Sequence, residues 1–291
     1  MTPTRVFGCD FKHPVLLAAG TCGFGEPVVD VMSLDQIGGL VTKSVTLEPR
    51  LGNPAPRVAE YAHGMLNSVG LANPGLDAVR ATKLPWMVEH LKGLPTFVSV
   101  AGHTAEEYRA IVAGLDSEDG FFGFELNLSC PNDSRLGGKP FSLDAEALAE
   151  VMSLVRPETK RPLLVKLAPN DPDIAGTAEA AVRGGADGIT AINTAPGFLF
   201  NSERSAPELG AGPGGTSGPG ILPLGLAAVR LIAARVDVPV IGVGGILSAR
   251  DAAAYLEAGA SLVQVGTGSF ADPRCGARVA QGLALTHESN R

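Results

Sequence analysis

Short apolar runs rich in β-branched residues recur along the chain, and helix-like patterns separate most of them. Runs of this length between Gly and Pro signals are typical of strands that are buried on both faces. Eight segments fit: VLLAAG (15–20), GLVTK (39–43), TFVSV (96–100), FGFELNL (122–128), PLLVKL (162–167), DGITAIN (187–193), PVIGVGG (239–245) and SLVQVG (261–266).

Helix-like patterns fill three of the intervening segments, at 144–156, 171–185 and 248–260, and cap signals mark the last two. The second opens on Asp and ends on Gly, and the third runs from Ser to Gly. Eight buried strands alternating with helices imply parallel crossovers, and eight strands close a (β/α)8 TIM barrel with its active site at the C-terminal strand ends. A chain of 291 residues suits one such domain over 1–291.

An open doubly wound sheet is the alternative fold. It lacks support because no G-x-G-x-x-G motif follows the first strand and opens a helix. GAGPGG at 210–215 matches the pattern but follows no strand, contains Pro213 and continues into TSGPG. We interpret 210–215 as a flexible loop.

Two connections, 46–75 and 194–220, are too long and too rich in Gly, Pro and Asn to be helices alone. A third, shorter one covers 131–142 directly after Cys130. Long loops in a compact domain are uncommon and tend to be functional, so we expect a functional role for these segments.

Composition narrows the function classes. The net charge is -7 and no Lys/Arg-rich stripe is present, which argues against nucleic-acid binding. The N-terminus lacks a signal-peptide pattern and no apolar run approaches the roughly 20 residues that span a bilayer, so we expect a cytoplasmic protein. The four cysteines form no C-x-x-C pair, and an iron–sulfur cluster would therefore sit on another chain.

Polar residues end most of the predicted strands and should meet at one mouth of the barrel. They are Gly20, Lys43, Ser44, Ser99, Asn127, Cys130, Lys166, Asn193, Thr194, Gly244, Gly245, Gly266 and Thr267. The glycines of IGVGGI and VGTGS, on the last two strands, fit the usual phosphate site of these barrels better than plain tight turns.

Lysine and cysteine at these strand ends are candidates for binding an anion and for catalysis. Lys43 and Lys166 end apolar strands, where a lysine is costly to bury unless it meets an anion; a solvated strand end is the other interpretation. Near a flavin, such a lysine would stabilise the reduced ring. Cys130 in NLSCPN is either a small buried residue or a general base shielded by a loop.

Taken together, VTKSVTLEPRLGNPAPRV, GMLNSVGLANPG, ELNLSCPN, VKLAPN, INT, GGTSGPG, IGVGGI and VQVGT resemble the class 1 dihydroorotate dehydrogenases. The matches run in order from about residue 15 to 273, which is nearly the whole chain. The resemblance implies oxidation of dihydroorotate to orotate in pyrimidine biosynthesis. Cys130 would take a proton from the carbon beside the carbonyl, and hydride would pass from the neighbouring carbon to bound FMN.

The resemblance also implies binding residues. Those for substrate are Lys43, Asn67, Ser68, Val69, Gly70, Leu71, Asn127, Asn132, Asn193 and Thr194. Those for FMN are Gly20, Lys43, Ser44, Ser99, Asn127, Lys166, Ile192, Gly218, Gly244, Gly245, Gly266 and Thr267. Asparagine suits a pyrimidine ring because its side chain both donates and accepts hydrogen bonds.

Within the family, a cysteine base and the absence of an N-terminal membrane extension separate the chain from the class 2 enzymes, which use serine. The segments GGKPFSLDAEAL and GGTSGPGILP look more similar to type B than to the fumarate-using type A. Type B implies a partner subunit with FAD and a [2Fe-2S] cluster, NAD as final acceptor, and a homodimer core within a heterotetramer.

Two features depart from the family pattern. Ser99 stands where asparagine is usual, and the loop PNDSRLGGKPFS is a residue longer than the commonest type B form. The serine would alter one hydrogen bond to the flavin or the substrate. The longer loop would alter closure over Cys130, and with it the rate or the electron acceptor.

Three rival functions remain open at this point: an FMN-dependent dihydropyrimidine dehydrogenase, a dihydrouridine synthase, and a barrel that binds a phosphorylated ligand without catalysis. The acidic charge argues against the RNA-binding synthase.

Overall fold

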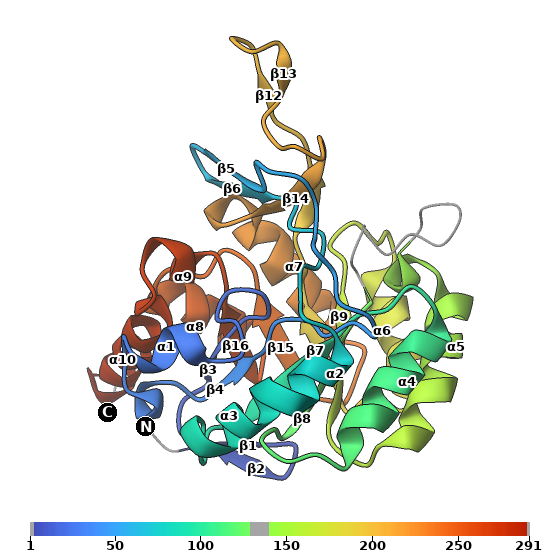
Figure 1. The fold of residues 1–291 in the computed structure, drawn as a ribbon. Helices are drawn as coiled ribbons and strands as arrows, with labels where there is room; N and C mark the ends of the chain where they lie inside the picture. Colours follow the sequence, from blue (N-terminus) through green and yellow to red (C-terminus); the bar gives the residue numbers. More distant parts are fainter. Residues whose placement is uncertain (1–2, 129–139, 290–291) are drawn as a thin grey trace.

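The computed structural model describes residues 3–128 and 140–289 of the chain, with the side chains of 287–289 left out. Eight parallel strands close into a barrel, in chain order around the ring (Figure 1). They are β3 (Val15–Leu17), β4 (Gly39–Val41), β7 (Thr96–Val100), β8 (Gly123–Asn127), β9 (Leu163–Leu167), β10 (Gly188–Ala191), β15 (Val240–Val243) and β16 (Leu262–Val265). Each lies within one of the eight predicted segments, which confirms the predicted (β/α)8 TIM barrel.

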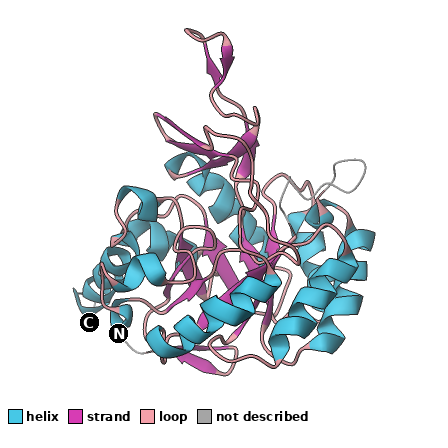
Figure 2. Cartoon of the chain, in the orientation of Figure 1, coloured by secondary structure: helices cyan, strands magenta, loops and turns pink. Residues whose placement is uncertain are grey.

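Helices surround the barrel on its outside (Figure 2). They are α1 (Glu26–Val29), η1 (Leu34–Gln36), α2 (Leu76–Ala78), the π-helical η2 (Val79–Lys83), α3 (Leu84–His90), α4 (Ala105–Asp116), η3 (Phe141–Leu143), α5 (Ala145–Val155), η4 (Arg156–Glu158), α6 (Ile174–Arg183), η5 (Pro219–Ile221), α7 (Leu222–Ala233), α8 (Ala249–Glu257), α9 (Gly268–Ala271) and α10 (Cys275–Ser289).

The helices predicted at 144–156, 171–185 and 248–260 are confirmed as α5, α6 and α8. The Asp144 side chain accepts a hydrogen bond from the Ala147 N–H at the start of α5. Ser248 and Asp251 form a reciprocal capping box on α8. Helix α6 begins later than its predicted start, because Asp173 rather than Asp171 supplies the capping oxygen.

The apolar core has two shells. The larger shell lies between the strands and the helices. The smaller one fills the inside of the barrel with side chains such as Leu16, Phe97, Leu164 and Ile241. The hairpin of β1 (Thr4–Val6) and β2 (Cys9–Phe11) packs against this inner cluster through the fully buried Phe11.

The connections at 46–75 and 194–220 form a second sheet. Their strands β5 (Val58–Tyr61), β6 (Gly64–Asn67), β11 (Ala195–Gly197) and β14 (Gly214–Ser217) pair antiparallel in the order β11-β14-β6-β5. The loop predicted at 210–215 is therefore wrong at Gly214 and Gly215, which belong to β14. This strand lies between β11 and β6, and β6 is remote in the sequence, so no local pattern marks it.

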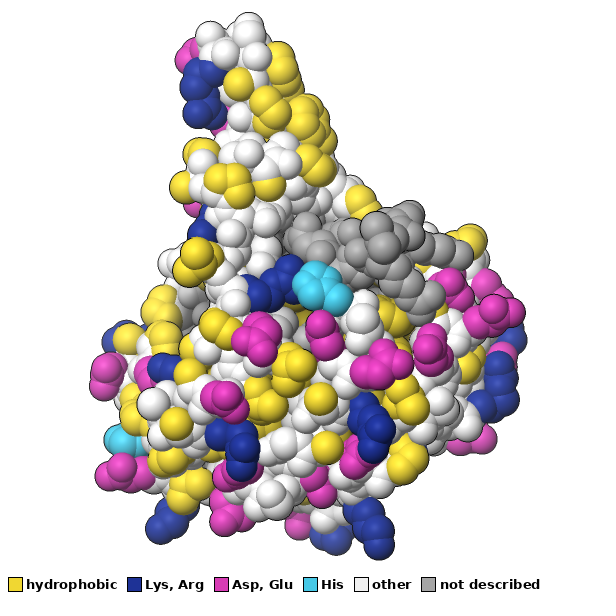
Figure 3. Space-filling model, turned by 45° about the vertical axis from the view of Figure 1, so that its right-hand side comes forward, with side chains coloured by type: hydrophobic (Ala, Val, Ile, Leu, Met, Phe, Trp, Pro, Cys, Tyr) yellow, Lys and Arg dark blue, Asp and Glu magenta, His cyan; other side chains and the backbone are white. Residues whose placement is uncertain are grey.

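A small hairpin of β12 (Phe200–Asn201) and β13 (Ala206–Pro207) projects beyond that sheet (Figure 1). Figure 3 shows hydrophobic side chains gathered along one side of the projection. Phe198 and Phe200 are each more than half exposed.

Within the described residues, no helix is both long and apolar enough to cross a bilayer.

The inner shell gives a test of stability. Replacing Phe11 with alanine should lower the free energy of unfolding by about 3–5 kcal/mol, because the closed barrel cannot collapse around the missing ring. Urea unfolding followed by the fluorescence of Trp86 would measure this loss. The control Leu231→Ala, whose side chain is 57% exposed, should change stability by no more than about 0.5 kcal/mol. Equal losses in the two variants would contradict the assignment of Phe11 to the core.

Candidate active site

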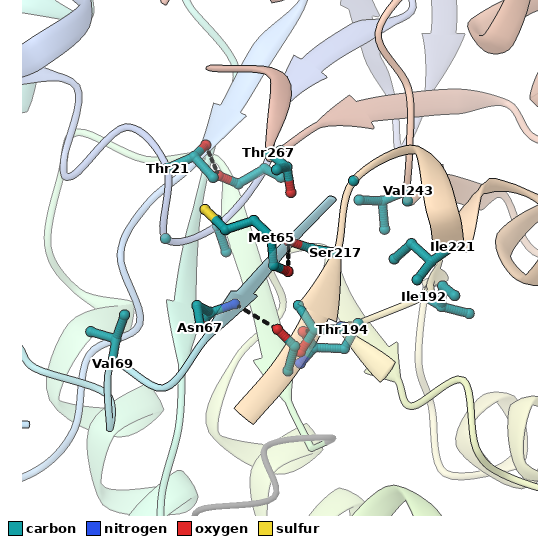
Figure 4. Close-up of a pocket in the computed structure, with 18 of the residues that line it drawn as sticks. Thr21, Met65, Asn67, Val69, Ile192, Thr194, Ser217, Ile221, Val243 and Thr267 are labelled. Carbon is teal, nitrogen blue, oxygen red and sulfur yellow. Dashed lines mark hydrogen bonds between the residues drawn. The ribbon is translucent and has the colours of Figure 1, made fainter. Parts of the chain in front are cut away.

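A cavity lies between the carboxyl ends of the barrel strands and the four-stranded sheet (Figure 4). Ile192, Ile221 and Val243 lie together on one side of it, while Met65 and Asn67 of β6 contribute from the sheet. The long connections therefore cover the mouth of the barrel, where enzymes of this fold place their active sites.

Most of the residues predicted for the site line this cavity. They are Gly20, Lys43, Ser44, Asn67, Val69, Gly70, Leu71, Asn127, Lys166, Ile192, Asn193, Thr194, Gly218, Gly244, Gly245, Gly266 and Thr267. They come from segments far apart in the chain, and the barrel and the second sheet bring them together.

Two predicted residues lie just behind the wall. The Ser68 side chain is buried, and its hydroxyl accepts a hydrogen bond from Asn53 Nδ2 at 2.8 Å. Ser99 is fully buried, and its hydroxyl lies 2.8 Å from that of Ser44. Neither side chain is among the lining groups. The predicted Cys130 and Asn132 lie outside the described residues.

Sequence reasoning missed ten lining residues: Ala18, Ala19, Thr21, Val58, Met65, Gly215, Ser217, Ile221, Val243 and Phe270. Ala19 and Thr21 are next to Gly20 in the sequence, and Val243 is next to Gly244. Their position at predicted strand ends could therefore have indicated them. Met65, Gly215 and Ser217 come from the second sheet, whose strand pairing no local pattern announces.

The charged side chains of the cavity lining are cationic although the chain is acidic. Among the described residues that line it, Lys43 and Lys166 carry charge and none is acidic. The Lys166 side chain is 7% exposed and forms an ion pair with the buried Glu125. Cations that are kept from water beside an open space favour an anionic ligand.

Amides and hydroxyls form a connected row on one wall. Asn127 Nδ2 donates a hydrogen bond to Ser44 Oγ at 3.4 Å, and Asn193 Nδ2 donates to Asn127 Oδ1 at 3.2 Å. Asn193 Oδ1 in turn accepts from the Thr194 N–H at 2.8 Å. These bonds fix the directions in which the two side-chain amides present their remaining donors and acceptors.

Glycines form the opposite end of the cavity. Gly218, Gly244 and Gly245 have φ values of 91°, 127° and 74°, which side chains with a Cβ rarely adopt. A Cβ on Gly245 would lie 2.8 Å from Leu222 Cβ. The backbone is thus exposed next to Gly266 and the start of α9, an arrangement suited to phosphate oxygens.

Tyr255 supports this glycine turn from below. Its buried hydroxyl donates a hydrogen bond to the Gly244 carbonyl at 2.8 Å. Burial raises the pKa of the Tyr255 hydroxyl, so the proton that it donates is retained at neutral pH.

None of the three described cysteines is among the lining residues. Burial, together with nearby Glu26, raises the pKa of the Cys22 thiol to about 12. Burial is also the main cause that raises the pKa of Cys9 and of Cys275. Their thiols stay protonated at neutral pH, which agrees with the interpretation of these residues as structural.

The chain matches the family model for dihydroorotate dehydrogenase over residues 1–286. It is 42% identical, over 98% of its length and 93% of the relative, to a protein of Geotalea uraniireducens named dihydroorotate dehydrogenase B (NAD(+)), catalytic subunit. Proteins of the same name in Cutibacterium acnes and Desulforudis audaxviator are 41% and 42% identical over 95% and 97% of the chain, and over 90% and 91% of the relatives. The chain therefore belongs to the dihydroorotate dehydrogenase family.

Proposed function

We propose that the chain is the catalytic subunit of an NAD-linked dihydroorotate dehydrogenase, which binds FMN in the cavity and oxidises dihydroorotate to orotate for pyrimidine biosynthesis. One observation carries the proposal: two lysines, a row of amides and a glycine-lined end face a single cavity at the barrel mouth. In a family that is flavin-dependent in general, such a cavity is the natural place for the flavin.

The residues present fit FMN in shape and charge. The exposed backbone at Gly218, Gly244, Gly245 and Gly266, with Thr267, would hold the phosphate. Gly20, Ser44, Asn127, Lys166 and Ile192 would contact the ring system, and Ser99 would act by holding the Ser44 hydroxyl. When bound, the flavin would accept the hydride that the substrate loses.

Dihydroorotate would meet the amide row and the segment 67–71. Asn67, Asn127, Asn193 and Thr194 offer donors and acceptors that suit the two ring amides. Lys43 would hold the carboxylate. The Ser68 hydroxyl already accepts a hydrogen bond from Asn53, so Ser68 would contribute its backbone. We assign Cys130 as the general base and Asn132 as a further substrate ligand, both outside the described residues.

The electrons would leave through a partner subunit. The relatives' names, which specify NAD(+) and a catalytic subunit, support a separate electron-transfer chain. We assign FAD and a [2Fe-2S] cluster to that chain, around a homodimeric core, in the cytoplasm. The exposed Phe198 and Phe200 support burial of the projecting hairpin in an assembly.

An anaerobic titration of the purified yellow protein tests the proposal. Dihydroorotate should bleach the flavin absorbance stoichiometrically, because the reductive half-reaction needs no second subunit. Addition of fumarate or of NAD with the partner would then distinguish the two acceptors. A flavin that is bound but stays oxidised would show that the substrate is another pyrimidine, such as one without the carboxylate.

The assigned base gives a second prediction. Cys130→Ser should retain FMN but lose at least about 100-fold in kcat at neutral pH, since a serine hydroxyl is far less readily deprotonated than a thiol and supplies almost no anionic base there. Stopped-flow measurement of flavin reduction isolates this step. Cys22→Ser is the matched control, because Cys22 is buried and does not line the cavity, and its rate of flavin reduction should be normal. Near-normal reduction by Cys130→Ser would contradict the assigned role.

A matched pair of glycines tests where FMN binds. Gly20 (φ 83°) lines the cavity and Gly212 (φ 81°) does not, and a Cβ at either would meet no atom within 4 Å. Alanine at either position should cost about 1–2 kcal/mol in stability. Only Gly20→Ala should also weaken FMN binding, by roughly tenfold or more, because its methyl group would occupy ligand space. Fluorescence titration of the apoproteins with FMN would measure the difference, and equal affinities would exclude Gly20 from the flavin site.

A further inference from the structure

Glu125 is a fully buried acidic residue that the proposed mechanism does not use. It lies on β8 two residues before Asn127, and successive inward-facing strand positions are two apart. Below it, the interior of the barrel is filled by apolar side chains such as Phe97 and Leu164. A carboxylate between an apolar plug and the floor of the cavity is costly to bury unless it is compensated.

Three strands supply that compensation. Thr190 Oγ1 of β10 donates a hydrogen bond to Glu125 Oε2 at 2.9 Å, and Gln264 Nε2 of β16 donates to the same oxygen at 2.8 Å. The other oxygen, Oε1, has no hydrogen-bond partner among the described residues and lies 3.6 Å from Lys166 Nζ of β9. Two neutral groups therefore anchor one oxygen, and the second oxygen faces the lysine.

Lys166 is the member of this buried ion pair that reaches the cavity. It lines the cavity, although its side chain is only 7% exposed. In the barrel register it pairs with Thr190 on one side and with Asn127, which also lines the cavity, on the other. The further cation of the described lining is Lys43, which follows β4.

The geometry points to Glu125 as a positioning residue, whose carboxylate holds the Lys166 ammonium group at the floor of the cavity and thereby favours the reduced state of the bound flavin. This inference rests on the proposed function. A ring that takes up two electrons and one proton as a hydride gains a negative charge. A fixed cation beside the ring stabilises that charge. Without its counter-ion, an ammonium group so poorly solvated would lose either its fixed position or its charge.

A double-mutant cycle on the potential of the bound flavin tests this coupling. The variants are Glu125→Gln, Lys166→Met and the two combined, and each is titrated anaerobically against a reference dye. Glu125→Gln alone should weaken the preference for reduced flavin about tenfold, a shift of about 30 mV to lower potential for a two-electron couple. When position 166 is methionine, Glu125→Gln should cause no further shift. The double variant should therefore have the same flavin potential as Lys166→Met alone. Thr190→Val, which removes one hydrogen bond and no charge, should shift it less than threefold.

The unfolding temperatures of the apoproteins provide a readout that needs no flavin. Breaking a buried ion pair leaves one uncompensated charge, whereas neutralising both partners does not. The double variant should therefore unfold at a higher temperature than Glu125→Gln, and this ordering tests the pair even if that single variant fails to hold FMN. Equal potential shifts with Lys166 present and absent, no shift at all, or a double variant less stable than Glu125→Gln would overturn the inference. A wild-type protein that binds FMN but is not reduced by dihydroorotate would contradict the proposed function alone.

Discussion

Closure of the barrel depends on the pairing of the first and last of its strands, β3 with β16. Val15 lies opposite Val263 and Leu17 opposite Val265, although nearly the whole chain separates them. Once this pairing forms, the sheet has no edge, and all eight carboxyl ends point to the same mouth. The lysines, amides and glycine turns can share one cavity only because the ring is closed.

Closure also divides the interior into two layers with opposite chemistry. Toward the amino ends of the strands, the inner apolar cluster is packed by the β1–β2 hairpin and excludes water. Toward the carboxyl ends, polar side chains such as Glu125, Thr190 and Gln264 replace it, and they bond to one another. The dry lower layer strengthens the electrostatic interactions above it, since it removes the solvent that would screen them.

The second sheet completes the site. Residues of β6 and β14 face the strand ends across the cavity, so the ligand space lies between two rigid elements. Asn67 illustrates the effect: its side-chain amide donates to the Gly215 carbonyl at 3.2 Å and is held in place by a strand almost 150 residues away. A loop of the same composition would leave these groups to be ordered by the ligand, at a cost in conformational entropy.

The sequence by itself determined the barrel strands, the capped helices and most of the lining residues, because buried parallel strands carry continuous apolar runs and their last residues share one mouth. Its family motifs also indicated the chemistry. Tertiary structure alone decided that Gly214 and Gly215 are strand rather than loop, since β14 is held between β11 and the distant β6. It likewise placed Ser99 behind Ser44 and Glu125 beneath Lys166. Those contacts join different strands, and a pattern with a period of two residues specifies which side chains face inward but not which of them meet.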